Sequence, residues 1–309
     1  MNSAFNANPT SNPRILILGA AGQLGHELAH CFAGFGSVTA AAREAADLTA
    51  PDQLRAVIRR VQPELILNAA AYTAVDRAEA EPELAYAINA EAPRVLAEEA
   101  LRCGALFVHY STDYVFDGRK EEPWTEADAP NPLNVYGASK LAGEQSIAAL
   151  GCKYLIFRTS WVYSPHGRNF LLTMLRLARE RTSLSIVDDQ TGAPTTAIEL
   201  ARATRAIVSG ILAGQYGAPQ EWRGLYHMTC AGAVSWFGFA QAIFARASEL
   251  LALQPPQLVP IATENYPTPA ARPRNSVLSN AKLHARFAVH LAAWQSALEE
   301  SVQALRAPE

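Results

Sequence analysis

The sequence predicts an α/β protein built on a doubly wound parallel sheet, followed by a smaller, interleaved C-terminal domain. In the first half of the chain, short apolar runs alternate with longer helical patterns, which is typical of βαβ units. The strand-like runs are almost continuously apolar, as expected for a parallel sheet covered on both faces. A glycine-rich turn joins the first strand-like run to the first helical pattern. These three observations together indicate the fold class.

The first half contains the expected sheet and its crossover helices. The expected strands are Arg14–Leu18, Ser37–Ala40, Leu65–Leu67, Leu106–Tyr110 and Tyr154–Arg158. The expected helices are Gln23–Ala33, Pro51–Gln62, Pro82–Cys103 and Asn131–Leu150. Pro51 and Asp52 suit a first helical turn, where an amide hydrogen is not needed and negative charge is favoured. Gly104 and Gly151 suit helix ends, because glycine readily adopts the left-handed conformation found there.

The second half is less regular. The expected helices are Asn169–Arg181, Ala197–Leu212, Ser235–Leu253 and Leu291–Leu305, and the expected strands are Leu184–Val187 and Leu225–Met228. Residues 188–196 and 266–276 are rich in proline and polar side chains. Such segments either carry binding groups on a rigid scaffold or are ordinary turns.

Composition limits the classes of function. The chain has 309 residues, of which 50% are hydrophobic, so it can bury a large core without disulfides or metals. Its net charge is −3 and it has no polybasic run, which argues against nucleic-acid and membrane partners. Four scattered cysteines lack metal-ligand spacing and are expected to be reduced. With neither a secretory signal nor an apolar span, we expect a cytoplasmic protein.

The glycine turn Gly19-Ala20-Ala21-Gly22-Gln23-Leu24-Gly25 lies directly between the first expected strand and helix. Its glycines allow a tight turn, close approach of a pyrophosphate to the backbone and close helix–strand packing. The following helix offers amide hydrogens and partial positive charge to that pyrophosphate. Strand, glycine turn and helix in this order predict a Rossmann dinucleotide site that includes Gly19, Gly22, Gln23, Leu24 and Gly25.

The second strand should recognise the adenosine ribose of the cofactor. No carboxylate ends this strand, and Arg43 follows it, which favours the 2′-phosphate of NADPH over NADH without settling the choice. The alternative is that Arg43 is a solvated loop charge. Asp47 and Leu48 are expected to bond and cover the adenine. The small residues 68–71 (NAAA) would let the cofactor lie close to the backbone.

Tyr136 and Lys140 form a Y-x-x-x-K motif within an expected helix, where residues four apart share a face. A nearby ammonium lowers the pKa of a phenol, so the pair can act as a tunable proton donor. Thr112 follows the fourth strand, at the sheet edge where open α/β sheets bind ligands, and could bond a reacting carbonyl oxygen. The alternative for the motif is an ordinary surface pair. The histidines expected to be core or surface residues without catalytic roles are His109, His166, His227, His284 and His290.

These motifs, in this order, resemble the extended short-chain dehydrogenase/reductase family. Longer matching stretches are residues 110–118 (YSTDYVFDG), 131–140 (NPLNVYGASK), 158–163 (RTSWVY), 189–195 (DQTGAPT) and 266–276. The resemblance covers about residues 14–305. It implies NADPH-dependent reduction of the C4 ketone of dTDP-4-dehydro-β-L-rhamnose to dTDP-L-rhamnose, the last step of dTDP-rhamnose biosynthesis for bacterial surface polysaccharides such as lipopolysaccharide O-antigen.

The resemblance also implies residue roles. Tyr136 would protonate the developing alkoxide, and Lys140 would lower the pKa of that tyrosine and bond the nicotinamide ribose. Thr112 would orient the ketone, Asp113 would touch the sugar, and Trp161 would pack on the substrate. The residues implied to line the cofactor are Ala71, Tyr72, Thr73 and Tyr110.

Some implied features fit the pattern less directly. Tyr72 stands where histidine is expected, which is tolerable if its backbone does the binding. Arg272, with Arg274 as a neighbour, is the candidate for the nucleotide diphosphate, and Asn275 also matches the family. Some relatives use magnesium, but no carboxylate cluster suggests ligands for it, so the metal stays open.

Two alternative functions remain at this stage. One is another nucleotide-sugar reductase, an epimerase or a dehydratase of the same fold, although Tyr114 replaces the glutamate that dehydratases need. The other is a non-catalytic regulatory subunit. We expect a flexible leader at 1–13, an NADPH-binding domain at 14–160 and a substrate domain at 161–309, with segments near 196–230 returning to the first domain. A monomer or a homodimer would suit this organisation.

Overall fold

A six-stranded sheet in the order β10-β5-β4-β3-β1-β2 forms the centre of the protein, and every neighbouring pair in it is parallel. The structure is a computed structural model that describes residues 12–306. Most of the expected leader at 1–13 lies outside these residues. The strands are β1 (Arg14–Leu18), β2 (Ser37–Ala41), β3 (Leu65–Asn68), β4 (Leu106–Thr112), β5 (Lys153–Thr159) and β10 (Gly224–His227).

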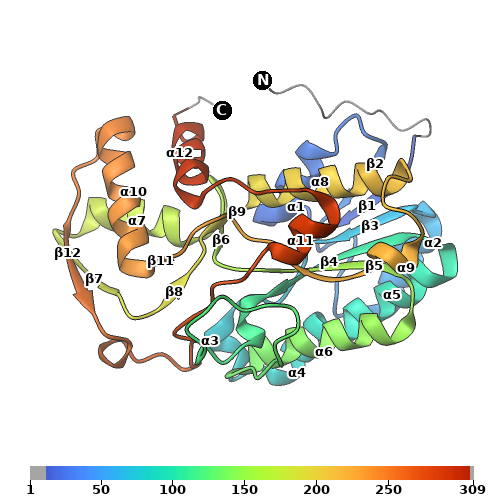
Figure 1. The fold of residues 1–309 in the computed structure, drawn as a ribbon, viewed down its shortest axis with the longest axis horizontal. Helices are drawn as coiled ribbons and strands as arrows, with labels where there is room; N and C mark the ends of the chain where they lie inside the picture. Colours follow the sequence, from blue (N-terminus) through green and yellow to red (C-terminus); the bar gives the residue numbers. More distant parts are fainter. Residues whose placement is uncertain (1–11, 307–309) are drawn as a thin grey trace.

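Helices cover both faces of this sheet (Figure 1). In β1, Ile15 and Ile17 pack with α1 and α8 on one face, whereas Leu16 and Leu18 pack with α2 and α5 on the other. The helices of the sheet layers are α1 (Gln23–Cys31), α2 (Pro51–Val61), α5 (Ala92–Cys103), α6 (Val135–Leu150) and α8 (Ala197–Leu212). Because successive side chains of a strand point to opposite faces, continuously apolar strands serve two cores. The predicted doubly wound α/β fold is confirmed.

A second group of elements lies beside the sheet, around its own apolar core (Figure 1). Its helices are α7 (Phe170–Glu180), α10 (Trp236–Leu251) and α12 (Trp294–Ala304). Short strands pair within it: β7 (Ser183–Val187) with β12 (Gln257–Ile261), β6 (Val162–Tyr163) with β9 (Thr195–Thr196), and β8 (Thr191–Gly192) with β11 (Val234–Ser235). Between these segments the chain returns to the sheet, where α8 packs against α1 and β10 pairs with β5.

Two expected helices differ most from the structure, and the others differ by at most three residues at an end. The helix expected at 82–103 consists of α4 (Pro82–Tyr86), a π-helical turn at Ala87–Glu91 and α5. The helix expected from Asn131 begins at Val135, because the side chain of Asn134 caps it by accepting a hydrogen bond from the amide of Gly137 at 2.8 Å. The remaining short helices are α3 (Val75–Ala78), α9 (Pro219–Trp222) and α11 (Ala281–Phe287).

Within residues 12–306, none of the helices combines the length and the apolar character needed to span a lipid bilayer. All four cysteines are free thiols.

Candidate active site

A cavity of 810 Å³ opens along the carboxyl ends of the sheet strands. One end lies at the glycine turn and Arg43, the middle is formed by residues after β3 and β4, and the other end reaches Trp161 and Trp236. Open α/β sheets bind ligands at this edge, because the turns that leave the strands there create a crevice. The predicted residues that line it are Gly19, Gly22, Gln23, Leu24, Arg43, Asp47, Leu48, Ala71, Thr73, Tyr110, Thr112, Asp113, Tyr136, Lys140 and Trp161.

The glycine turn is shaped by two close approaches. Gly19 has φ +75°, and a Cβ there would lie 2.8 Å from the backbone of Ala70. A Cβ on Gly25 would lie 2.0 Å from the carbonyl oxygen of Gly19, so Gly25 contributes helix–strand packing rather than cavity lining. Gly22 is the N-cap of α1 and no side chain caps this helix, so its amide end faces the cavity. The turn thus offers a site for a phosphate group.

The end of the cavity near β2 carries one charged pair. Arg43 donates to Asp47 over 3.2 Å, and the Arg43 side chain is 74% exposed. Asp47 also accepts hydrogen bonds from the amide and hydroxyl of Thr49, which lower the pKa of its carboxyl. The exposed guanidinium stands at the cavity edge, where an incoming anionic group can reach it.

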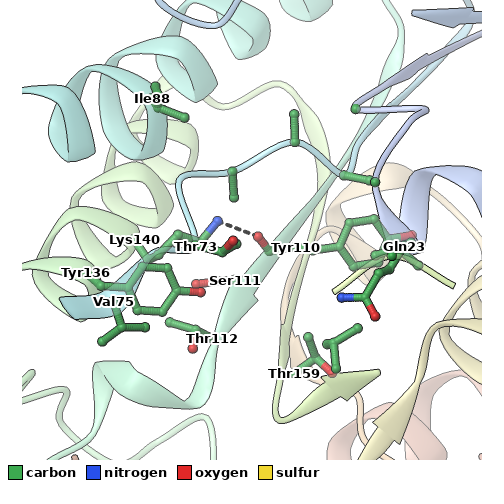
Figure 2. A pocket seen from close by; sticks show the side chains of 18 of the residues that line it. Gln23, Thr73, Val75, Ile88, Tyr110, Ser111, Thr112, Tyr136, Lys140 and Thr159 are labelled. Atoms are coloured by element: carbon green, nitrogen blue, oxygen red, sulfur yellow. Dashed lines mark hydrogen bonds between the residues drawn. The ribbon is translucent and has the colours of Figure 1, made fainter. Parts of the chain in front are cut away.

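Tyr136 and Lys140 occupy successive turns of α6 on the cavity side, and Lys140 extends toward the backbone of Tyr110 (Figure 2). The Lys140 ammonium donates to the carbonyl of Tyr110 over 2.6 Å. Burial lowers the pKa of Lys140 to about 8, although Glu144 opposes this shift. Burial raises the pKa of Tyr136 to about 12, and a hydrogen bond with Thr112 opposes it. Tyr136 therefore keeps its proton at neutral pH, and with an ionisable amine nearby it can act as a proton donor.

His109 is buried as expected, but it is also a neighbour of the catalytic candidate Lys140. Its Nε2 lies 3.2 Å from Lys140 Nζ, and its Nδ1 lies 3.1 Å from the amide nitrogen of Asn68. Burial and the Lys140 charge lower the pKa of His109 well below its usual range. His109 is therefore a neutral ring that contacts the amine, a role that the sequence analysis missed.

Thr112 and Asp113 lie at the end of β4 next to Tyr136. The Thr112 hydroxyl donates to Asp113 over 3.0 Å and accepts from the amide of Tyr114 over 3.2 Å. Burial raises the pKa of Asp113 to about 7, while hydrogen bonds from Ser276 and Thr112 oppose the rise. Asp113 can therefore exchange a proton near neutral pH.

Several buried polar atoms at the cavity have no hydrogen-bond partner among the residues described. They are the hydroxyl of Ser111, the hydroxyl of Thr159 and Oδ2 of Asp113. Ser111 and Thr159 come from the ends of the neighbouring strands β4 and β5 (Figure 2). Buried polar groups are normally satisfied, so these atoms fit a polar ligand such as a dinucleotide with a sugar. Ser111 and Thr159 lie at the carboxyl ends of strands, where open α/β sheets bind ligands, so the sequence could have identified them as site residues.

Trp161 stacks on Trp236 at one end of the cavity, with ring centroids 3.5 Å apart and planes 7° apart. Trp161 has φ +47°, a left-handed conformation that is strained for a tryptophan and is often found at functional sites. Gly192 lies beneath it, since a Cβ there would come within 2.5 Å of the Trp161 ring. Trp236 was not predicted, because nothing near it in the sequence marks a strand end.

Besides Gly25, three predicted site residues lie outside the cavity lining. Both backbone groups of Tyr72 bond the side chain of Asn89, and the expected contact of this backbone with the cofactor stays a prediction. Arg272 makes a two-bond ion pair with Asp76, each bond 2.8 Å long. The Asn275 amide donates to carbonyl groups of residues 120–122. In this structure these side chains hold loops together.

Magnesium is not supported. Within the described part of the chain, one group of three His, Cys, Asp or Glu side chains lies close enough to share a metal ion, and it consists of His26, Glu27 and His166. Magnesium prefers oxygen ligands, so two imidazoles and one carboxylate do not fit it. The ring of His166 lies 4.0 Å from that of His26.

The fold and the cavity define an oxidoreductase of the Rossmann type. A family model described as RmlD substrate binding domain matches residues 13–307, and the chain belongs to this family.

The chain is 48% identical over 289 residues to a dTDP-4-dehydrorhamnose reductase of Burkholderia thailandensis, covering 92% of this chain and 96% of that protein. It is 43% identical over 298 residues to the enzyme of the same name from Escherichia coli K12, covering 94% and 97%. A crystal structure of dTDP-4-dehydrorhamnose reductase from Bacillus anthracis in complex with NADP is similar, with TM-score 0.85, 36% identity and coverage of 94% and 98%.

Proposed function

We propose that the protein reduces the C4 ketone of dTDP-4-dehydro-β-L-rhamnose with NADPH to give dTDP-L-rhamnose. The observation that carries this proposal is the joint presence of Tyr136, Lys140 and Thr112 in one cavity that begins at the glycine turn. The names of the family members that match nearly the whole chain give the substrate class. The NADP in the Bacillus anthracis structure supports the cofactor.

The cofactor would lie along the strand ends from Arg43 to Tyr136. The amide end of α1 suits its pyrophosphate, and Arg43, as an exposed cation at the edge, suits a 2′-phosphate. Asp47 and Leu48 would contact the adenine, and Lys140 would bond the nicotinamide ribose. When bound, NADPH supplies a hydride to the ketone carbon.

The protein's own residues would handle the proton. Thr112 and Tyr136 line the same cavity, so a ketone oxygen between them would meet two hydroxyl donors. Tyr136 would protonate that oxygen as negative charge develops on it, and a charged Lys140 would make the resulting phenolate less unfavourable. The side chains of Thr112 and Lys140 are buried, so their interactions with the substrate and with Tyr136 would be stronger than in water.

The substrate sugar would lie toward the second group of elements. Asp113 and the stacked Trp161–Trp236 pair would contact it, and residues 161–309 would form the substrate domain, apart from the segments that join the sheet. Arg272 and Asn275 stay predictions for the diphosphate end. Cytoplasmic location and a monomeric or homodimeric state also stay predictions.

A substrate panel tests the proposal. Purified protein should oxidise NADPH in the presence of dTDP-4-dehydrorhamnose, and Tyr136→Phe should lower kcat by roughly 100-fold to 10,000-fold, as expected for loss of a general acid. A circular dichroism spectrum like that of the wild type would show that the variant folds. Equal rates for Tyr136→Phe and wild type would remove Tyr136 as the acid.

The alternative functions have different signatures. An epimerase would convert the sugar without net NADPH oxidation, and a regulatory subunit would show no turnover. Neither is supported by the names of the relatives reported above.

A further inference from the structure

Helix α1 and the segment after β6 meet through three side chains that the proposed reductase chemistry does not use. They are His26 and Glu27 on α1 and His166 in that segment. Nε2 of His166 lies 3.3 Å from Oε1 of Glu27, and Nδ1 of His26 lies 3.7 Å from the same oxygen. The potential ligand atoms of all three lie within 4.8 Å of one another.

The contact between His166 and Glu27 is not an ordinary hydrogen bond. Nε2 of His166 is buried and has no hydrogen-bond partner among the described residues, although the carboxylate oxygen is near. The rings of His26 and His166 meet edge to face with centroids 4.0 Å apart. Both imidazoles carry ring nitrogens of the kind that most often bind metals in proteins.

We propose that His26, Glu27 and His166 form a binding site for a divalent transition metal of the zinc class. An ion with tetrahedral bonds of about 2.0–2.2 Å holds its ligand atoms roughly 3.3–3.6 Å apart. Of the two separations to Glu27, 3.3 Å falls in this range and 3.7 Å lies just above it. Small side-chain rotations bring the third pair into range, and water completes the coordination. Two imidazoles and one carboxylate form a donor set that suits zinc and not magnesium.

The site would cross-link α1 to a segment that borders the cavity. Gly167 and Arg168, next to His166, line the cavity, and Asn169 donates to the side chain of Gln23 on α1 over 2.8 Å. A metal that binds only the folded protein stabilises it by mass action. Zinc binding should therefore raise the melting temperature, and it does not depend on the proposed reductase activity.

The test is a titration of Zn²⁺ into untagged, chelator-treated protein, followed by calorimetry. We expect one tight site per chain. Loss of a supporting residue alone costs a metal site roughly 10-fold to 100-fold in affinity, so His166→Ala and His26→Ala should each weaken binding by at least about 100-fold. Co²⁺ should give the visible absorption of a four-coordinate ion with the wild type and lose it in both variants.

A second histidine pair provides a matched control. The rings of His284 and His290 lie 3.6 Å apart on the surface, outside the three-residue group. The double variant His284→Ala/His290→Ala should keep the tight site. Unchanged Zn²⁺ affinity in His166→Ala, or loss of the site in the control, would overturn the proposal. Because His26 and His166 are partly exposed, metal-free melting curves of their variants should match the wild type and show that they fold.

Discussion

The hydrogen atoms around Lys140 can be assigned from the structure. The side-chain oxygen of Asn68 accepts from the amide of Ala70 over 3.2 Å, which fixes the Asn68 amide. Its nitrogen therefore donates to Nδ1 of His109 over 3.1 Å. A neutral imidazole carries one hydrogen, so that hydrogen lies on Nε2, 3.2 Å from Nζ of Lys140. The His109 N–H can donate a hydrogen bond to the neutral amine of Lys140, but it is repelled by the charged ammonium form.

His109 should therefore favour the neutral form of Lys140, in addition to the burial that lowers the Lys140 pKa to about 8. His109→Leu removes the donor and keeps the site apolar. A neutral hydrogen bond contributes about 0.5–1.5 kcal/mol, and one pKa unit corresponds to about 1.36 kcal/mol. We predict that the substitution raises the Lys140 pKa by roughly 0.4–1.1 units.

The assay is kcat for NADPH oxidation from acidic to alkaline pH. The proposed mechanism needs a charged Lys140, so activity holds below the Lys140 pKa and falls as pH rises through it. His109→Leu should keep its activity to a higher pH than the wild type.

His227→Leu is the control, because His227 is also fully buried, but it lies outside the cavity lining and bonds the carbonyl of Trp124. The assigned hydrogen positions would be refuted if the loss of kcat at high pH occurred at the same pH in His109→Leu as in the wild type, or at a lower pH.

Three other substitutions test packing and cofactor choice. Glu144 accepts two hydrogen bonds, of 2.9 and 2.6 Å, from the buried guanidinium of Arg158. Glu144→Gln leaves that positive charge buried without a negative partner, so we predict that the free energy of unfolding, measured with urea, falls by about 3–5 kcal/mol. Gly25→Ala places a Cβ 2.0 Å from the Gly19 carbonyl, so it should lower the melting temperature and weaken NADP⁺ binding, measured by calorimetry. Arg43→Ala should reduce the ratio of kcat/KM for NADPH to kcat/KM for NADH by roughly tenfold, because one exposed charged hydrogen bond to the 2′-phosphate is lost. An unchanged ratio would show that Arg43 does not contact the cofactor.

The sheet was predictable because its strands are buried on both faces. Apolar runs such as residues 14–18 and 106–110 admit few other structures, and they coincide with β1 and most of β4. The strand β12 was missed for a physical reason. It contains Pro260 and leaves all of its residues partly or fully exposed, so it lacks the pattern of a central strand. The helix α3 has only four residues, too few to show a helical period.

The cofactor end of the site was also predictable, because its residues follow strand ends directly in the sequence. Contacts between distant segments were not. The ion pair between Arg272 and Asp76 joins residues 196 positions apart, and no local pattern reveals it. Arg272 therefore looked available for a phosphate. Trp236 reaches the cavity at the first turn of α10, after a loop whose path depends on the whole second group of elements.

His109 lies between these two cases, since part of its environment follows from strand alternation. Side chains two apart on a strand share a face, and Phe107 packs into the core that also contains Ile147 of α6. His109 must then face the same helix, which is the helix that carries Lys140. Its burial and its direction could be inferred from residues 106–110 alone. The distance to the amine could not, because it depends on how far α6 lies from the sheet, and the close packing of Gly143 against Asn89 helps to set that position.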